Sequence, residues 1–325
     1  MRIIFFGTPD YVSPIITALH KNFSDETNSP IVAVVTQNPK PVGRKQLLEY
    51  SAVDTWAYKH KIPVFYNANA LLTKGFKADL GIVASYGSLL PPGIVKSFPH
   101  GTLVIHPSLL PFFRWSSPVQ AAIITNSNPT GVTIIKMDEK FDHGPIVAQF
   151  KEDVMPQDTT ETLRARLFER SAQVLVDLIP AYLSGKIHLK EQDHKKASFA
   201  QSIKKEDAFI PPQYIQNALN GKSAKEEWKI NFIKDYSAKP DAIFLERFIR
   251  AMNPWPVAWT CINLSTTEGQ TKRIKILKAH IEEEINPSTN KQVCKLVPNE
   301  IQLEGKNPVF WKQFVKAYSL FSFKK

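Results

Sequence analysis

The first 150 residues alternate short apolar runs with amphipathic segments, and this alternation limits the possible folds more than any other feature of the sequence. Several runs are apolar on both faces, which is the pattern of strands buried between two layers. Amphipathic segments over Tyr11–Lys21 and Ala52–His60 would cover such a sheet as helices. The sequence therefore predicts an α/β domain with a doubly wound, mostly parallel sheet, in which ligands bind outside the carboxyl ends of the strands. The predicted strands are Ile3–Phe6, Ile31–Thr36, Val64–Phe65, Leu80–Ser85, Thr102–His106 and Val132–Met137.

The second half of the chain has a different character. An amphipathic helix is predicted from Thr160 to about Tyr182, and a polar segment follows it. Short strand-like stretches separated by turn signals then follow a second helix, which is typical of a small β-barrel of the oligonucleotide-binding (OB) kind. We predict the α/β domain over residues 1–187, a linker over 188–207, and the β-barrel domain over 208–325 with an insertion near 208–240. The second helix is predicted at Phe244–Met252, and the strands at Ala258–Asn263, Arg273–His280, Gln292–Leu296 and Glu300–Glu304.

Composition excludes several classes of protein. Of the 325 residues, 43% are hydrophobic and 22% charged, as in globular proteins and unlike disordered ones. No apolar run is long enough to cross a bilayer, the N-terminal apolar stretch is too brief for a signal peptide, and the two cysteines suggest neither a disulfide framework nor a metal site. We therefore expect a cytoplasmic protein without a membrane contact or a metal, and we expect it to be a monomer.

The positive charge is concentrated towards the C-terminal part. The formal net charge is +11; residues 1–150 carry 13 basic and 9 acidic side chains, whereas residues 201–325 carry 20 and 13. An excess of this kind suits a polyanionic partner, and equally a generally basic surface in water.

The strongest chemical signal is a histidine at the end of a predicted strand. His106 closes the strand Thr102–His106, and Asp142 follows the strand Val132–Met137. If these strands are neighbours, their carboxyl ends bring the imidazole and the carboxylate together. A carboxylate orients an adjacent imidazole and favours its charged form, as general acid–base catalysis or charge stabilisation requires. The residues alone leave open whether the pair is catalytic or structural.

A series of short segments carries a resemblance to a known family. The segments are Phe6–Asp10, Val34–Gln37, Pro41–Arg44, His106–Pro111, Ser117–Gln120, Gly131–Ile134, Asp142–Pro145, Ile249–Pro256 and Ile274–Ala279. In these segments and their order, the chain resembles the methionyl-tRNA formyltransferases, a branch of the formyltransferases that use 10-formyltetrahydrofolate. The match extends over nearly the whole chain and is poorest at residues 208–240.

The resemblance implies transfer of a formyl group from N10 of 10-formyltetrahydrofolate to the α-amine of methionine on initiator tRNA, for translation initiation. His106 would hydrogen-bond the formyl oxygen or its oxyanion, and Asp142 would tune His106 and relay a proton through water. The folate would lie against three segments. Their residues are Ser108, Leu109, Leu110 and Pro111; Tyr86, Gly87, Ser88, Leu89 and Leu90; and Met137, Asp138, Glu139, Lys140 and Phe141.

The resemblance also implies two contacts with tRNA. The basic loop Gln37–Gln46 corresponds to a family loop that enters the major-groove side of the acceptor stem, and the basic C-terminal domain would hold the tRNA backbone. The candidate residues are Lys40, Arg44 and Lys45 in the loop, with Arg44 as the candidate for a specific contact, and Arg273 and Lys275 in the C-terminal domain.

Two positions depart from the family pattern. Val104 stands two residues before His106, where the family has an asparagine, and valine cannot donate a hydrogen bond to an oxyanion. Trp115 follows Arg114 where relatives usually carry a glycine. Three functions therefore remain open: the formyl transfer to tRNA, formyl transfer to a small amine such as that of a nucleotide sugar, and folate or RNA binding by a weak or inactive relative.

Overall fold

The computed structural model of this chain describes residues 1–26, 28–43, 45–264, 271–286, 290–318 and 321–323. These residues form two compact units. The first unit comprises Met1–Arg114, Pro129–Asp153 and Arg164–Ser198, and the second comprises Trp115–Asn128, Val154–Leu163 and Phe199–Lys325. Among the residues described, no helix combines the length and the apolar character that a membrane span requires.

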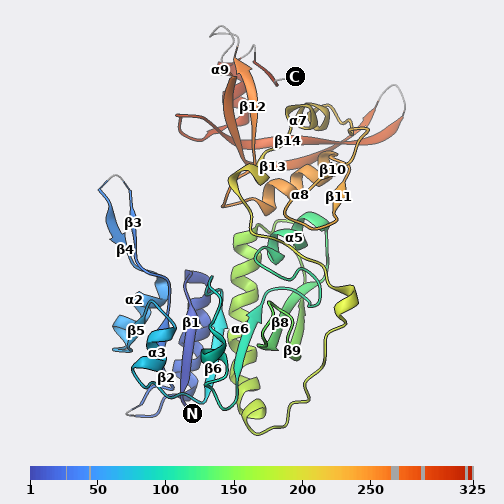
Figure 1. Ribbon diagram of the computed structural model, residues 1–325. Coiled ribbons are helices and arrows are strands. Elements are labelled where there is room, and N and C mark those ends of the chain that lie inside the picture. The colour runs from blue at the N-terminus through green and yellow to red at the C-terminus, as the bar shows by residue number, and fades with distance from the viewer. Residues whose placement is uncertain (27, 44, 265–270, 287–289, 319–320, 324–325) are drawn as a thin grey trace. The chain divides into compact units, whose positions relative to one another are not determined.

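A seven-stranded sheet forms the centre of the first unit. Its strands are β1 (Ile3–Gly7), β2 (Ile31–Val35), β5 (Val64–Phe65), β6 (Leu80–Ala84), β7 (Thr102–His106), β8 (Thr130–Lys136) and β9 (Ile146–Glu152). They lie in the order β5-β2-β1-β6-β7-β8-β9 (Figure 1). The strands from β5 to β7 are parallel, whereas β8 is antiparallel to both β7 and β9. The predicted doubly wound, mostly parallel α/β fold is thus confirmed, and β9 is a strand that the prediction missed.

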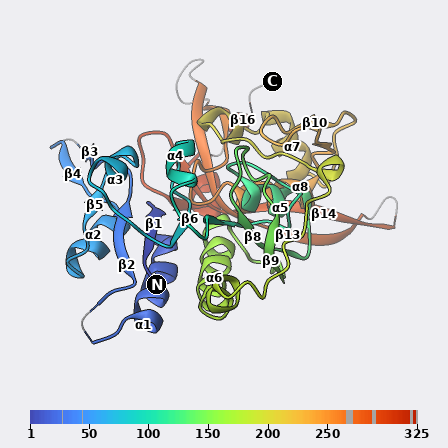
Figure 2. The same ribbon diagram turned by 60° about the horizontal axis from the view of Figure 1, so that its bottom comes forward.

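Helices cover both faces of this sheet. They are α1 (Ser13–Phe23), α2 (Ala52–Lys59), α3 (Asn69–Thr73), α4 (Pro92–Val95) and α6 (Thr160–Leu183). Figure 2 shows α1 and α6 on one side of the sheet and α3 and α4 on the other. Ile4 and Phe6 of β1 pack in one apolar cluster with Leu71 of α3 and Ile94 of α4. Because both faces are covered, every residue of β1 and β6 is buried.

The basic segment Gln37–Gln46, predicted as a loop, forms most of a two-stranded hairpin. Its strand β3 (Lys40–Val42) pairs antiparallel with β4 (Leu47–Glu49). All residues of both strands are exposed, and Figure 1 shows the hairpin standing away from the sheet of the first unit. The hairpin therefore keeps this basic segment open to solvent.

The second unit is built on a five-stranded antiparallel sheet, where the sequence predicts a small β-barrel of the OB kind. Its strands lie in the order β15-β14-β13-β12-β16. Residues 208–240, predicted as an insertion, contain a helix and a separate two-stranded pair. The strands of the large sheet are β12 (Trp259–Leu264), β13 (Thr271–Asn286), β14 (Lys291–Leu303), β15 (Val309–Phe310) and β16 (Phe321–Phe323), and the pair is β10 (Trp228–Lys229) with β11 (Ser237–Ala238). The helices are α5 (Pro118–Thr125), α7 (Pro212–Leu219), α8 (Ala242–Ala251) and α9 (Trp311–Ala317).

The hairpin of β13 and β14 corrects one prediction. The sequence predicts separate strands at Gln292–Leu296 and Glu300–Glu304, whereas the structure has the single strand β14. Pro298, which resembles a strand break, lies opposite Ala279, where the register of the two strands shifts. An irregular register of this kind accommodates a proline inside a strand, because the ladder is already interrupted there.

Candidate active site

His106 and Asp142 lie together in the first unit, but not for the reason that the sequence suggests. The prediction treats them as the ends of neighbouring parallel strands, whereas β8 runs antiparallel to β7. The end of β8 therefore lies beside the start of β7, where the Met137 N–H donates to the Thr102 carbonyl oxygen at 2.8 Å. The chain beyond Met137 then folds back towards the opposite end of β7. This return places the Asp142 Oδ1 3.5 Å from the His106 Nδ1.

The His106 imidazole is enclosed, and both of its nitrogens face acceptors. Its side chain is 6% exposed and that of Asp142 is 12% exposed. Nε2 lies 2.9 Å from the Phe113 carbonyl oxygen, while Nδ1 faces the Asp142 carboxylate. A neutral imidazole can donate to one of these acceptors, whereas an imidazolium donates to both. The pair can therefore hold and release a proton at a sheltered point, as general acid–base catalysis requires.

The turn that carries Asp142 is tightly constrained. Asp142 has a φ of 50°, in the left-handed region that aspartate tolerates better than most residues do. Gly144 passes so close to β8 that a Cβ on it would lie 1.9 Å from the Lys136 carbonyl oxygen. In the same loop, the His143 Nδ1 lies 2.6 Å from the Asp138 Oδ2. The close contact of Gly144 with β8 therefore explains why a glycine stands at this position, without any role in the chemistry.

Gln192 bonds the turn directly, and Arg114 and His194 lie behind it. The Gln192 Nε2 donates to the carbonyl oxygens of Asp142 at 2.9 Å and of Gly144 at 2.8 Å. The Gln192 Oε1 accepts from Arg114 Nη2 at 2.7 Å, and the same Nη2 lies 2.8 Å from the His194 Nδ1. Asp142 is therefore connected to Arg114 through one buried amide.

The electrostatics of this group agree with its hydrogen bonds. Desolvation, the His143 ring and the Arg114 guanidinium lower the pKa of His194, which favours the neutral ring that Nδ1 needs in order to accept from Arg114. The His143 and His194 rings stack with their centroids 3.9 Å apart. Burial lowers the pKa of Arg114, and the carboxylates of Asp142 and Asp138 oppose that shift. Arg114 thus acts as a buried cation beside the turn.

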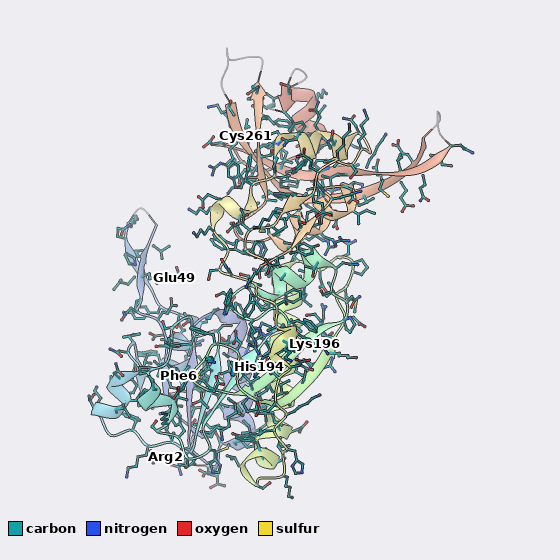
Figure 3. The ribbon with its side chains drawn as sticks, turned by 45° about the vertical axis from the view of Figure 1, so that its right-hand side comes forward. Arg2, Phe6, Glu49, His194, Lys196 and Cys261 are labelled. Carbon is teal, nitrogen blue, oxygen red and sulfur yellow. The ribbon has the colours of Figure 1, made fainter. Side chains whose placement is uncertain are left out.

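Sequence reasoning missed Gln192 and His194. Both belong to residues 188–207, which are rich in Lys, Gln and Glu and are predicted as a linker. In the structure this segment begins along the first unit, where Lys190 pairs with Ile146 of β9, and Figure 3 labels His194 on it. Gln192 is buried, yet one buried amide in a polar segment shows no periodicity or spacing that would set it apart.

The loop Ser108–Pro111, predicted to line the folate site, is held through its backbone. The Thr133 hydroxyl donates to the Ser108 carbonyl oxygen at 2.7 Å and accepts from the Leu110 N–H at 2.9 Å. The side chains of Ser108 and Leu110 are buried, and the other two are half-buried. A ligand at this loop would contact the loop backbone and the half-buried side chains of Leu109 and Pro111.

The second predicted folate segment, Tyr86–Leu90, follows β6 at the sheet edge where His106 ends β7, because these two strands are parallel. Gly87 has a φ of 80°, and a Cβ on it would meet the Gln37 Nε2 at 2.6 Å. The backbone conformation therefore favours glycine here, and a larger residue would also displace the end of the Gln37 side chain. Tyr86 and Leu90 are buried, whereas Gly87, Ser88 and Leu89 are exposed.

The third segment, Met137–Phe141, is the first part of the loop that returns Asp142 to His106. The Lys140 N–H donates to the Asp138 Oδ1 at 2.9 Å, and Glu139 forms an exposed ion pair with Lys96. Met137 and Asp138 are half-buried, and the last three residues are exposed. Two large apolar side chains are exposed in these segments: Phe141 is 59% exposed, and Leu89 of the second segment is 66% exposed. Exposed large apolar side chains near enclosed polar groups are common at ligand sites.

Val104 occupies the place of the expected asparagine. It lies two residues before His106 on β7, so the two side chains point to the same face of the sheet. Val104 is half-buried and packs against an apolar cluster that includes Phe6 and Phe98. An apolar surface therefore stands where the family pattern has a hydrogen-bond donor.

The backbone explains the second departure, at Trp115. Its φ is 82°, in the left-handed region that costs a residue with a Cβ roughly 1–2 kcal/mol. A glycine adopts this conformation without that cost. The Trp115 ring packs on Phe199 with centroids 4.5 Å apart, and this contact offsets the strain here.

The predicted tRNA-contacting residues of the hairpin are exposed where the structure describes them. Lys40 and Lys45 both face solvent, and the Lys40 Nζ donates to the Gln37 Oε1 at 3.1 Å. Arg44 lies outside the described residues. The hairpin thus presents two lysines to any polyanion that reaches it.

The predicted residues of the second unit lie on adjacent positions of one strand face. Arg273 is exposed, and its guanidinium stacks over the Trp259 ring at 4.0 Å. Lys275 is half-buried and lies directly opposite Trp259 in the register of β12 and β13. Strand alternation therefore puts Arg273 and Lys275 on the same face, as predicted.

Known proteins resemble this chain over most of its length. The formyl transferase family pattern matches residues 1–179, and the pattern of the formyl transferase C-terminal domain matches residues 222–319. A methionyl-tRNA formyltransferase from Buchnera aphidicola is 35% identical over 269 residues, which cover 81% of this chain and 76% of the relative. One from Chloroflexus aggregans is 36% identical over 266 residues, which cover 80% and 76%.

Solved structures share the fold. The methionyl-tRNA formyltransferase from Clostridium thermocellum aligns with a TM-score of 0.52 and 17% identity, over 92% of this chain and 98% of that one. The N-formyltransferase from Helicobacter canadensis, solved with folinic acid and dTDP-3-aminofucose, aligns with a TM-score of 0.58 and 15% identity over the same shares. At these identities the likeness concerns the fold.

Proposed function

This chain belongs to the formyl transferase family, and we propose that it transfers the formyl group of 10-formyltetrahydrofolate to the α-amine of methionine on initiator tRNA. The relatives named methionyl-tRNA formyltransferases support this substrate, because they align over about four fifths of the chain. The observation that carries the chemistry is the enclosed pair of His106 and Asp142.

The reaction forms one C–N bond, breaks another and transfers one proton, and His106 and Asp142 can assist these steps. The co-substrate supplies an activated formyl group on N10; the C–N bond to the methionine amine forms, the C–N10 bond breaks, and a proton passes overall from the amine to N10. His106, whose Nδ1 lies 3.5 Å from Asp142, would donate from Nε2 to the formyl oxygen as negative charge develops there, in place of its contact with the Phe113 carbonyl oxygen. Asp142 keeps the imidazole oriented and relays the proton through water.

The folate site is proposed at the edge of the sheet where β6 and β7 end. The segments Ser108–Pro111 and Tyr86–Leu90 lie at that edge, and Met137–Phe141 begins beside the start of β7 and leads towards Asp142; together they would hold the ligand, largely through backbone groups. The exposed side chains of Leu89 and Phe141 would cover its apolar faces. This arrangement follows the rule that ligands of open α/β sheets bind beyond the carboxyl ends of the strands.

The tRNA is proposed to contact both parts of the chain. The domain over residues 1–187 would carry the chemistry, residues 188–207 would connect the domains, and the domain over 208–325 would hold the tRNA backbone. Lys40, Arg44 and Lys45 on the hairpin and Arg273 and Lys275 on β13 would contact it. Lysine and arginine side chains at such positions neutralise phosphates, so the affinity depends on salt.

The proposal is tested by incubating the protein with 10-formyltetrahydrofolate and initiator tRNA charged with methionine. We expect formylmethionyl-tRNA to form, and the affinity for tRNA to fall steeply with salt, by about 0.7–0.9 logarithmic units per tenfold salt for each phosphate neutralised. A nucleotide-sugar amine under the same conditions serves as the competing acceptor. Formylation of the sugar in place of tRNA, with little salt dependence, would favour a small-amine enzyme, and no product from either acceptor would favour a silent binding protein.

Val104 provides a separate prediction about rate. Replacing Val104 with asparagine places an amide donor beside His106, on the same face of β7. Since loss of one oxyanion donor costs about 10²–10³-fold in rate, we expect Val104→Asn to raise kcat, up to about that range. Single-turnover formylation is the measurement, with Val104→Leu as the apolar control. A kcat that does not rise at all would show that another group already supplies the donor.

A further inference from the structure

The position of Asp142 is not set by the sheet. Because β8 is antiparallel to β7, the sheet alone would leave the residues after β8 at the far end of β7 from His106. The loop from Met137 to Pro145 must return, and it does so through a left-handed residue at Asp142 itself. Besides its own hydrogen bonds, the turn has contacts with a residue outside the loop.

Gln192 makes the bracing contacts. Its amide nitrogen donates to two carbonyl oxygens of the turn, those of Asp142 and Gly144, and thereby uses both of its N–H groups. These bonds fix the backbone on both sides of His143 and direct the Asp142 carboxylate. Gln192 is 5% exposed, so water does not compete for these bonds.

The orientation of the Gln192 amide is itself fixed. Its oxygen accepts from Arg114 Nη2 at 2.7 Å, and Arg114 is 5% exposed. The charge on Arg114 forces the oxygen, and not the NH₂ group, to face it, so the NH₂ group must face the turn. The Arg114 Nε has no hydrogen-bond partner among the described residues, whereas Nη2 donates to the Gln192 Oε1 and lies 2.8 Å from the His194 Nδ1.

We propose that Gln192 is a positioning residue for formyl transfer: with its orientation set by Arg114, it holds the Asp142 carboxylate against His106. The inference rests on the proposed function for its chemistry, since Asp142 relays the proton in that reaction. It assigns residues 188–198 a role in the active site in addition to the connection of two domains. Gln192 touches no reacting atom, so its effect acts through Asp142.

The test compares Gln192→Met and Gln192→Glu with the wild type. Methionine keeps the length of the side chain without polar groups, and glutamate keeps the acceptor for Arg114 but loses both donors to the turn. We expect both variants to lower kcat by roughly 10–100-fold, the scale of a misplaced catalytic group, while KM for both substrates changes by less than about threefold. Gln173→Met is the matched control, because Gln173 is exposed on α6, and it should behave as wild type.

Two further measurements distinguish a positioning role of Gln192 from a loss of folding and from a failure of the proposed formyl transfer. Thermal melts should show both variants folded at the assay temperature. In protein with isotope-labelled histidine, the His106 Cε1–H resonance, assigned with His106→Gln, should shift in the Gln192 variants and not in Gln173→Met. If the wild type fails to formylate methionyl-tRNA, the proposed function is wrong, and the resonance alone decides the positioning role. An unchanged kcat, or an unchanged His106 resonance in folded Gln192→Met, would overturn the inference.

Discussion

Replacing His106 with alanine is expected to lower kcat for formyl transfer by about 10³-fold or more, because in the proposed reaction this ring supplies the donor to the formyl oxygen and takes part in the proton transfer. The ring is also part of the fold, since its Nε2 bonds the Phe113 carbonyl oxygen. Its loss should cost about 1–3 kcal/mol in the free energy of unfolding, measured in urea. Single-turnover kinetics on the folded variant then report the chemical step.

The controls for His106 use a second substitution and a second histidine. His106→Gln keeps a donor at the same place and should recover part of the lost rate. His188 is exposed after α6, so His188→Ala should leave kcat unchanged. If His106→Ala retained more than about a tenth of the wild-type rate, the effect would fall below that of general acid–base catalysis, and the ring would be structural.

Replacing Asp142 with asparagine should lower kcat by about 10²–10³-fold, because the amide keeps the size of the carboxylate but cannot accept a proton or balance an imidazolium. The negative charge of Asp142 also faces Arg114, so its removal leaves that buried guanidinium less well compensated. KM for folate should change far less than kcat, since in the proposed reaction Asp142 acts on the proton and not on binding.

The matched control is Asp177→Asn on the exposed side of α6, which should keep the wild-type rate. An unchanged kcat in Asp142→Asn would remove the carboxylate from the mechanism.

The sheet of the first unit was largely predictable, because its central strands are buried on both faces and its helices are amphipathic. Ile3–Gly7 and Leu80–Ala84 have almost no polar residue, and such runs have few alternatives in a chain of this length. The direction of β8 was not predictable, since an apolar run such as Thr130–Lys136 reads the same in either direction. The edge strand β9 alternates only weakly and gives a poorer signal still.

The candidate site was predictable in its residues but not in its geometry. His106 and Asp142 stood out through their place after strands and through the family resemblance, yet the loop that joins them follows from an antiparallel step that no local pattern reports. Gln192 was hidden because long-range hydrogen bonds leave no trace in a polar segment. The cost of Trp115 was equally invisible, because φ is a property of the fold and not of the residue type.

The Gln37 side chain, at the base of the hairpin, contacts both the hairpin and the loop after β6. The Gln37 amide bonds Lys40 through its oxygen and lies 3.5 Å from the Tyr86 carbonyl oxygen through its nitrogen, directly over Gly87. A nucleic acid that displaces the hairpin must move this amide, and a folate that presses on the loop must move it too. The two substrates would therefore not bind independently: occupancy at one place would alter the affinity at the other, in equal measure in both directions.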